Sequence, residues 1–248
     1  MFINHKHKFI FIHIPKNAGT SIRNSFDIHG YDKRVVRRRY PHYNCSEIKD
    51  YCGDDTWNEF YKFSVVRNPY ERMVSLYNFR KQGNDLYDYV GMHESPIGPD
   101  GKIWDFNRWI LSPEMKGTDE MGQKRMASDS YFHAYWYFKD NKQGYIGRNF
   151  IRTHLEFLNQ IDFLTNPLIG GRLMPDTIIR QENLIDEWNE MFKKLGYKAP
   201  KLGKSNTSKH TKKRTHYSHY YNDESYEFVT KLFSKDLSYF GYEFEDKR

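Results

Sequence analysis

Residues 9–25 of this chain read FIFIHIPKNAGTSIRNS. The apolar run at 9–14 predicts a short buried strand, and Pro15 ends it. Ile22 and Phe26 then lie about one helical turn apart, so we expect a helix to follow directly. A strand, a tight loop and a helix start point backbone N–H groups and the positive end of a helix dipole at one place. That arrangement suits a phosphate-like anion.

The loop between this strand and helix carries side chains that fit such an anion. Lys16 adds a cation on a long side chain, and Thr20 and Ser21 add hydroxyl donors. Taken alone, the same loop would also serve as an ordinary strand–helix turn, because short loops with a glycine are common.

Composition narrows the class of protein. A length of 248 residues suits one large domain, 1–248, and 17% aromatic residues supply apolar surface for a sizeable core. Disorder throughout the chain is therefore not expected. The formal net charge of +7 favours a polyanionic partner, either nucleic acid, an acidic polysaccharide, an anionic membrane or a nucleotide cofactor.

The cysteines and the N-terminal sequence bear on location. Cys45 and Cys52 form neither a disulfide framework nor a CxxC metal pair, which favours a reducing compartment. The first residues lack the features of a signal peptide, and no segment approaches the roughly 20 apolar residues of a membrane span. We therefore expect a soluble, cytoplasmic protein.

A second strand–loop–helix junction follows. Residues 60–66 are rich in Phe and Val and predict a strand, and RNPYERMVS occupies 67–75. Asn68 suits the cap of a helix that begins at Pro69, with Glu71 closing a capping box. By itself this segment would also fit a capped helix with a surface charge.

The remaining sequence completes an alternating pattern. Ser46 and Glu47 indicate a helix start, 177–180 a late strand, and 184–195 an amphipathic helix. Residues 83–125 are expected to form an insertion or lid-like region. Strands alternating with helices predict an α/β fold of three layers, with a central, mostly parallel sheet flanked by helices. In such sheets ligands bind at the carboxyl ends of the strands, where both junctions lie.

Together the two junctions resemble the donor-binding motifs of PAPS-dependent sulfotransferases. Residues 14–21 are similar to the loop that holds the 5′-phosphosulfate, and 66–72 with Ser75 are similar to the 3′-phosphate motif. The likeness is closest to the carbohydrate-type enzymes, the heparan and chondroitin sulfotransferases and their bacterial relatives. It continues at 180–184 and 236–244, and so covers most of the chain.

The resemblance implies a P-loop-like fold and transfer of a sulfuryl group from PAPS (3′-phosphoadenosine 5′-phosphosulfate) to an acceptor hydroxyl, releasing PAP. The acceptor it implies is a carbohydrate, which the basic composition allows to be acidic, and the family works without a metal. It also implies that Lys16 stabilises the leaving oxygens and that Arg67 and Ser75 hold the 3′-phosphate. The residues implied for the 5′-phosphosulfate are Lys16, Asn17, Ala18, Gly19, Thr20 and Ser21.

The acceptor hydroxyl needs a general base near neutral pH, which favours histidine. In the family a histidine precedes the helix between the two motifs, and His42 occupies that place here. We take His42 as the catalytic candidate. His13, beside the first loop, is the alternative, and a surface or core role is the simpler interpretation of any other histidine.

Two other functions stay open at this point. A P-loop-type nucleotide kinase is disfavoured because its GxxxxGK[ST] loop is absent. A non-catalytic protein that binds an anionic glycan or nucleic acid would use the basic segments 33–39 and 209–214. For the enzyme, no nucleic-acid partner is expected. The cations that could contact the cofactor in the later segment are Lys209, Lys212, Lys213 and Arg214.

Overall fold

The computed structural model describes residues 2–26, 42–81, 96, 101–112, 158–166, 171–202 and 215–248. The chain divides into two compact units, Met1–Asn68 with Asn159–Arg214, and Pro69–Leu158 with Thr215–Arg248. The expectation of a single domain over 1–248 stays a prediction.

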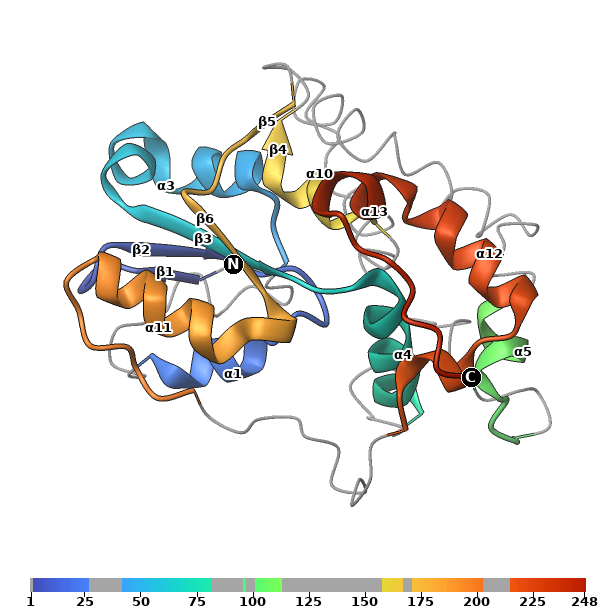
Figure 1. Ribbon diagram of the computed structural model, residues 1–248. Coiled ribbons are helices and arrows are strands. Elements are labelled where there is room, and N and C mark those ends of the chain that lie inside the picture. The colour runs from blue at the N-terminus through green and yellow to red at the C-terminus, as the bar shows by residue number, and fades with distance from the viewer. Residues whose placement is uncertain are drawn as a thin grey trace, which may run out of the picture. The chain divides into compact units, whose positions relative to one another are not determined.

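The first unit is built on a four-stranded sheet with the spatial order β1-β2-β3-β6 (Figure 1). The outer strand β1 runs antiparallel to β2, whereas β2, β3 and β6 run parallel to one another. The strand bounds are Phe2–Asn4 for β1, Phe9–Ile12 for β2, Tyr61–Val66 for β3 and Thr177–Arg180 for β6. The predicted strands at 9–14, 60–66 and 177–180 are confirmed, and the carboxyl ends of all three meet at one edge.

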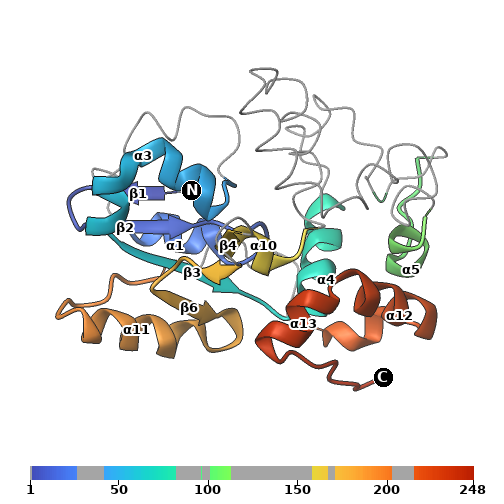
Figure 2. The same ribbon diagram turned by 90° about the horizontal axis from the view of Figure 1, so that it is seen from above.

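Helices cover both faces of this sheet (Figures 1 and 2). One face carries α1 (Gly19–Ser25) and α11 (Leu184–Lys194), and the other carries α3 (Cys45–Glu59). The predicted fold of three layers around a mostly parallel sheet is therefore confirmed.

The core of this unit explains why β2 is apolar along its whole length. Alternate strand residues such as Phe11 and Phe63 stack at 5.1 Å between ring centroids, and Phe63 meets Trp188 of α11 at 5.8 Å. The intervening residues, among them Ile10 and Ile12, are also buried. A parallel strand with helices on both faces needs apolar side chains on both of its sides.

The start of α3 differs slightly from the sequence prediction. The cap is Asn44, two residues before Ser46, and its side chain accepts from the Glu47 backbone N–H at 2.9 Å. The Glu47 carboxylate in turn accepts from the Asn44 backbone N–H at 3.1 Å, which completes a capping box. The predicted acid of the first turn, Glu47, is confirmed, whereas the predicted cap at Ser46 is wrong.

Four short elements complete the first unit. A small antiparallel ribbon pairs β4 with β5, and α10 leads into it. The bounds are Gln160–Leu164 for α10, Thr165–Asn166 for β4, Arg172–Leu173 for β5, and Gln181–Asn183 for the 3-10 helix η5.

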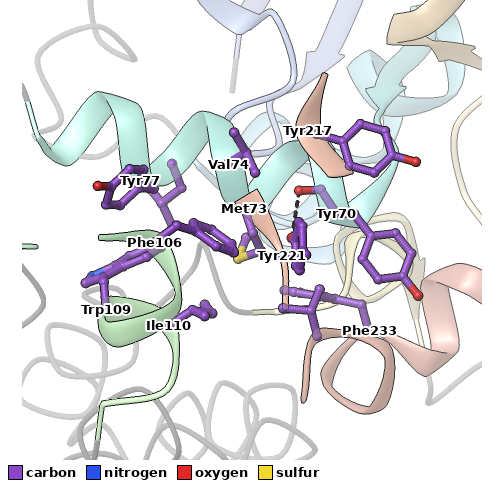
Figure 3. Close-up of a cluster of buried hydrophobic side chains, with 12 residues drawn as sticks. Tyr70, Met73, Val74, Tyr77, Phe106, Trp109, Ile110, Tyr217, Tyr221 and Phe233 are labelled. Atoms are coloured by element: carbon purple, nitrogen blue, oxygen red, sulfur yellow. Dashed lines mark hydrogen bonds between the residues drawn. The ribbon is translucent and has the colours of Figure 1, made fainter. Parts of the chain in front are cut away.

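The second unit is helical in its described part. Its elements are α4 (Pro69–Arg80), α5 (Phe106–Ile110), the 3-10 helix η6 (Tyr217–Tyr220), α12 (Asp223–Leu232) and α13 (Ser234–Phe240). Figure 3 shows the aromatic cluster between them. It consists of Tyr70, Met73, Val74, Leu76, Tyr77, Phe106, Trp109, Ile110, Tyr217, Tyr221, Val229 and Phe233.

One face of α4 contributes to this aromatic cluster, and on it Tyr70, Val74 and Tyr77 are buried. Two of the cluster's tyrosine hydroxyls are hydrogen-bonded to backbone carbonyls within the same unit. The Tyr221 hydroxyl donates to the backbone oxygen of Tyr70 at 2.9 Å, drawn as the dashed line in Figure 3. The Tyr77 hydroxyl donates to the Trp104 carbonyl at 2.8 Å. Aromatic rings thus supply area and hydroxyl groups at once.

Three sequence predictions fall on other parts of the chain. The basic segments 33–39 and 209–214, and most of the lid-like region 83–125, lie outside the described residues. Within the described part, no helix combines the length and the apolar character that crossing a membrane requires.

Candidate active site

The first loop leaves β2 at the carboxyl edge of the sheet and turns directly into α1. Two of its residues have a left-handed backbone, Lys16 with φ 68° and Ala18 with φ 55°, while Asn17 between them does not. Alternation of this kind turns successive backbone N–H groups toward one concave side, as in anion-binding nests. A left-handed residue other than glycine costs on the order of 1 kcal/mol, so the surroundings must hold the loop in shape.

A buried amide supports the loop from inside the unit. Asn17 Nδ2 donates to the Val65 carbonyl at 2.8 Å and to Oε1 of Gln160 at 2.6 Å. Neither Asn17 nor Gln160 has exposed surface. The Asn17 side chain is therefore part of the support of the loop, and an anion contact by this residue falls to its backbone N–H.

Gln160 also pairs with the backbone of Arg67, the first residue after β3. Its Oε1 accepts from the Arg67 N–H and its Nε2 donates to the Arg67 carbonyl, both at 2.9 Å. The amide thus repeats the two bonds that a neighbouring strand would make at the point where the ladder ends. Sequence reasoning missed Gln160, because the segment LNQIDFL at 158–164 carries two amides and an acid and has no motif that marks one of them.

The guanidinium of Arg67 reaches the first loop. Its Nη1 donates to the Lys16 carbonyl at 3.3 Å, and the residue is 8% exposed. Next to it, the Asn68 backbone N–H donates to the Glu182 carboxylate at 2.7 Å. The residues predicted from two separate motifs, Lys16 and Arg67, therefore come together in one unit.

His42 lies against His13, the first residue after β2. Its Nδ1 is 2.9 Å from the carbonyl oxygen of His13, and the two rings are 4.3 Å apart between centroids. Because a carbonyl only accepts, Nδ1 must carry the proton, which leaves the lone pair on Nε2 of the neutral ring. His42 is thereby held in the tautomer that a general base needs.

His13 is the weaker base of the pair. Burial lowers the pKa of His13 well below its usual range, and the charge of His42 lowers it further. The ring also stacks on Phe11 at 5.5 Å. These contacts make His13 a neutral packing partner at pH 7 and favour His42 as the proton acceptor.

His13 also explains why residue 19 is a glycine. A Cβ atom at Gly19 would lie 1.7 Å from Nε2 of His13, so a side chain has no room there. His42, His13 and the start of α1 are thus one packed group. The glycine of the motif serves close approach here.

The other predicted site residues lie at the same edge or in the second unit. Lys16, Thr20 and Ser21 keep part of their surface exposed. Ser75 lies half-buried on α4 in the second unit, so its pairing with Arg67 stays a prediction.

Within the described residues, no three His, Cys, Asp or Glu side chains gather as a metal site requires. His216 caps η6, with Nδ1 2.9 Å from the Ser218 hydroxyl.

Comparison with protein-family models identifies the family of this chain. The model of the sulfotransferase family matches residues 1–243. Comparisons with curated proteins and with solved structures gave no match. Since the family match extends over nearly the whole chain and includes both junctions, the protein belongs to the sulfotransferase family and is a PAPS-dependent transferase.

Proposed function

We propose that this enzyme transfers the sulfuryl group of PAPS to a carbohydrate hydroxyl without a metal ion. The observation that supports the site assignment most is that Arg67 donates to the Lys16 carbonyl of the first loop, while His42 contacts the carbonyl of His13 just before that loop. Three distant parts of the chain supply the three side chains that the reaction needs.

The first loop would hold the 5′-phosphosulfate. Its left-handed residues Lys16 and Ala18 turn backbone N–H groups to one side, with Asn17 and Gly19 contributing through the backbone. The hydroxyls of Thr20 and Ser21 would add donors. Lys16 would place its ammonium at the oxygen that becomes the leaving phosphate, where negative charge increases during transfer.

Arg67 and Ser75 would hold the 3′-phosphate. A guanidinium offers two parallel N–H donors to a phosphate, and a serine hydroxyl adds a third. Burial of Arg67 strengthens this interaction because the surrounding dielectric is low.

His42 would activate the acceptor. Nε2 would take the proton of the acceptor hydroxyl while the acceptor oxygen bonds to sulfur and the bond from sulfur to the phosphate oxygen breaks. The proton then resides on His42, the electron pair on the PAP leaving group, and the sulfate ester on the acceptor. The His13 carbonyl would stabilise the imidazolium through the Nδ1–H bond.

The choice of acceptor rests on weaker support than the donor site. The net charge of +7 and the sequence likeness to carbohydrate sulfotransferases favour a polysaccharide, including an acidic one. The cytoplasmic location likewise stays a prediction from the sequence.

Calorimetric titration with PAP tests the donor site directly, with ADP and ATP as controls in the presence of a chelator. We expect PAP to bind at least about tenfold more tightly than ADP, and Arg67→Ala to remove that preference. Equal affinity for PAP and ADP would refute the donor assignment. Sulfate transfer from labelled PAPS to a panel of polysaccharides and small phenols then tests the acceptor class, which fails if phenols alone are modified.

A further inference from the structure

The two anion-binding segments of the first unit come from distant parts of the chain. The loop at 15–19 and Arg67 after β3 would bind opposite ends of one donor, PAPS or PAP. A ligand with two anionic ends gains most when its two binding segments keep a fixed separation before it arrives. The side chain that sets this separation would therefore control affinity without touching the ligand.

Gln160 joins these segments from inside the unit, in addition to the bonds from Arg67 Nη1 to the Lys16 carbonyl and from Asn17 Nδ2 to the Val65 carbonyl. It accepts from Asn17 of the loop at 2.6 Å and makes both backbone bonds of Arg67 at 2.9 Å. The assignment of its amide is unambiguous, because the Arg67 carbonyl only accepts and the Arg67 N–H only donates. Asn17 must then use Nδ2 toward Gln160.

The orientation of Asn17 has a cost. With Nδ2 donating to both Val65 and Gln160, Oδ1 of Asn17 is buried without a hydrogen-bond partner among the described residues. A buried acceptor without a hydrogen bond loses its hydration and is destabilising. The fold accepts this cost and keeps the link between the loop and Gln160.

We infer that Gln160 is a positioning residue that fixes the loop at 15–19 relative to Arg67, so that the 5′ and 3′ groups of the donor bind together. The inference rests on the proposed donor site. A purely structural role would stabilise the unit without a preference for ligands that span both segments.

Three nucleotides separate the two roles in a calorimetric experiment. PAP carries both anionic ends, AMP carries the 5′-phosphate alone, and 3′-AMP carries the 3′-phosphate alone. The variant Gln160→Met keeps the volume of the side chain and removes its hydrogen bonds. We expect Gln160→Met to lower the affinity for PAP about tenfold and the affinities for AMP and 3′-AMP less than about threefold. Only PAP has two anionic ends, so only its binding depends on the distance between the two segments.

Thr165→Val is the matched control. Thr165 is also buried, lies at the end of the same helix, and donates its hydroxyl to the Ile161 carbonyl at 3.0 Å, away from both anion-binding segments. The melting temperature of Thr165→Val is expected to fall, while its affinity for PAP stays unchanged. The inference is overturned if Gln160→Met lowers the affinities for all three nucleotides equally, or lowers none of them.

A second variant keeps the test decisive if Gln160→Met does not fold. In Gln160→Glu one carboxyl oxygen still accepts as the amide oxygen did, and the other replaces the amide nitrogen. When the carboxyl is ionised, this second oxygen faces the Arg67 carbonyl and repels it. When the carboxyl is protonated, its O–H donates to that carbonyl as the amide does. The PAP affinity of Gln160→Glu relative to wild type is therefore expected to rise as the pH falls from about 9 to about 5 and the introduced carboxyl becomes protonated. A ratio that does not change across that whole range contradicts the positioning role, while wild type that does not prefer PAP over AMP contradicts the donor site itself.

Discussion

In the loop at 15–19, order comes from a few directional hydrogen bonds, whereas in the aromatic cluster of the second unit it comes from many ring contacts. Asn17 is held by two bonds, and the left-handed Lys16 and Ala18 depend on them. In the cluster, Tyr70 alone lies within 6.4 Å of four other aromatic rings, which are Tyr217, Tyr221, Tyr226 and Phe244. A site built on few bonds has an exact shape that one substitution destroys, whereas a cluster loses stability in small steps.

The largest effect is expected at His42, where one ring nitrogen carries the chemistry. His42→Ala should lower kcat by about 10²–10⁴-fold, because proton transfer from the acceptor loses its base. PAP affinity should change less than about threefold, since His42 is not assigned to the donor. Steady-state kinetics and calorimetry measure the two quantities, with exposed His219→Ala as the control. If kcat in His42→Ala equals that of wild type, His42 is not the general base and another group takes the proton.

The next effect is steric and tests how tightly the loop is packed. Gly19→Ala should lower the free energy of unfolding by about 1–3 kcal/mol, because the new methyl meets the His13 ring at 1.7 Å. Adding His13→Ala should restore part of that loss. The neighbouring Ala18→Gly is the control and should be tolerated, because φ 55° suits glycine. Denaturant unfolding measures all three, and an additive double variant would refute the contact.

A pH titration tests the buried histidine. Since the folded pKa of His13 is below its unfolded value of about 6.5, the folded state resists protonation. The stabilising contribution is therefore complete above pH 6.5 and is lost as the pH falls below it, by at most about 1.4 kcal/mol per pH unit. Unfolding at pH 7.5 and 5.5 measures the loss, and His13→Gln should reduce it. Equal pH dependence in both proteins would show that other groups are responsible.

The smallest effect is expected in the aromatic cluster. Tyr221→Phe keeps the ring and removes the hydrogen bond to the Tyr70 carbonyl, so it should cost about 1 kcal/mol of stability. PAP affinity should stay unchanged. The comparison between loop and cluster would fail if this variant lost donor binding while remaining folded.

Local patterns predicted the elements of the fold well. The apolar runs at 9–14 and 60–66 gave the central strands, and the stripe from Leu184 to Leu195 gave α11, because burial imposes a period that the sequence records. The short β1 was missed, since three residues are too few to show a period.

The candidate site was only partly accessible to such reasoning. The motifs indicated Lys16 and Arg67, but Gln160 is 93 residues beyond Arg67 and 143 beyond Asn17, with no local pattern to connect them. The contact between Gly19 and His13 was also hidden, because it depends on how the strand and the helix meet. Interactions between distant segments follow from the assembled sheet and not from any one window of sequence.

The pair formed by Arg67 and Gln160 has a consequence for how such enzymes diversify. The chain leaves the first unit after Asn68 and re-enters it at Asn159, so this pair closes the base of a long excursion, much as a base pair closes an RNA hairpin. Substitutions within 69–158 change neither partner of that closing pair, and only Ser75 in that range is assigned to the donor. Most of the excursion can therefore vary, and acceptor choice with it, without altering a residue assigned to the donor.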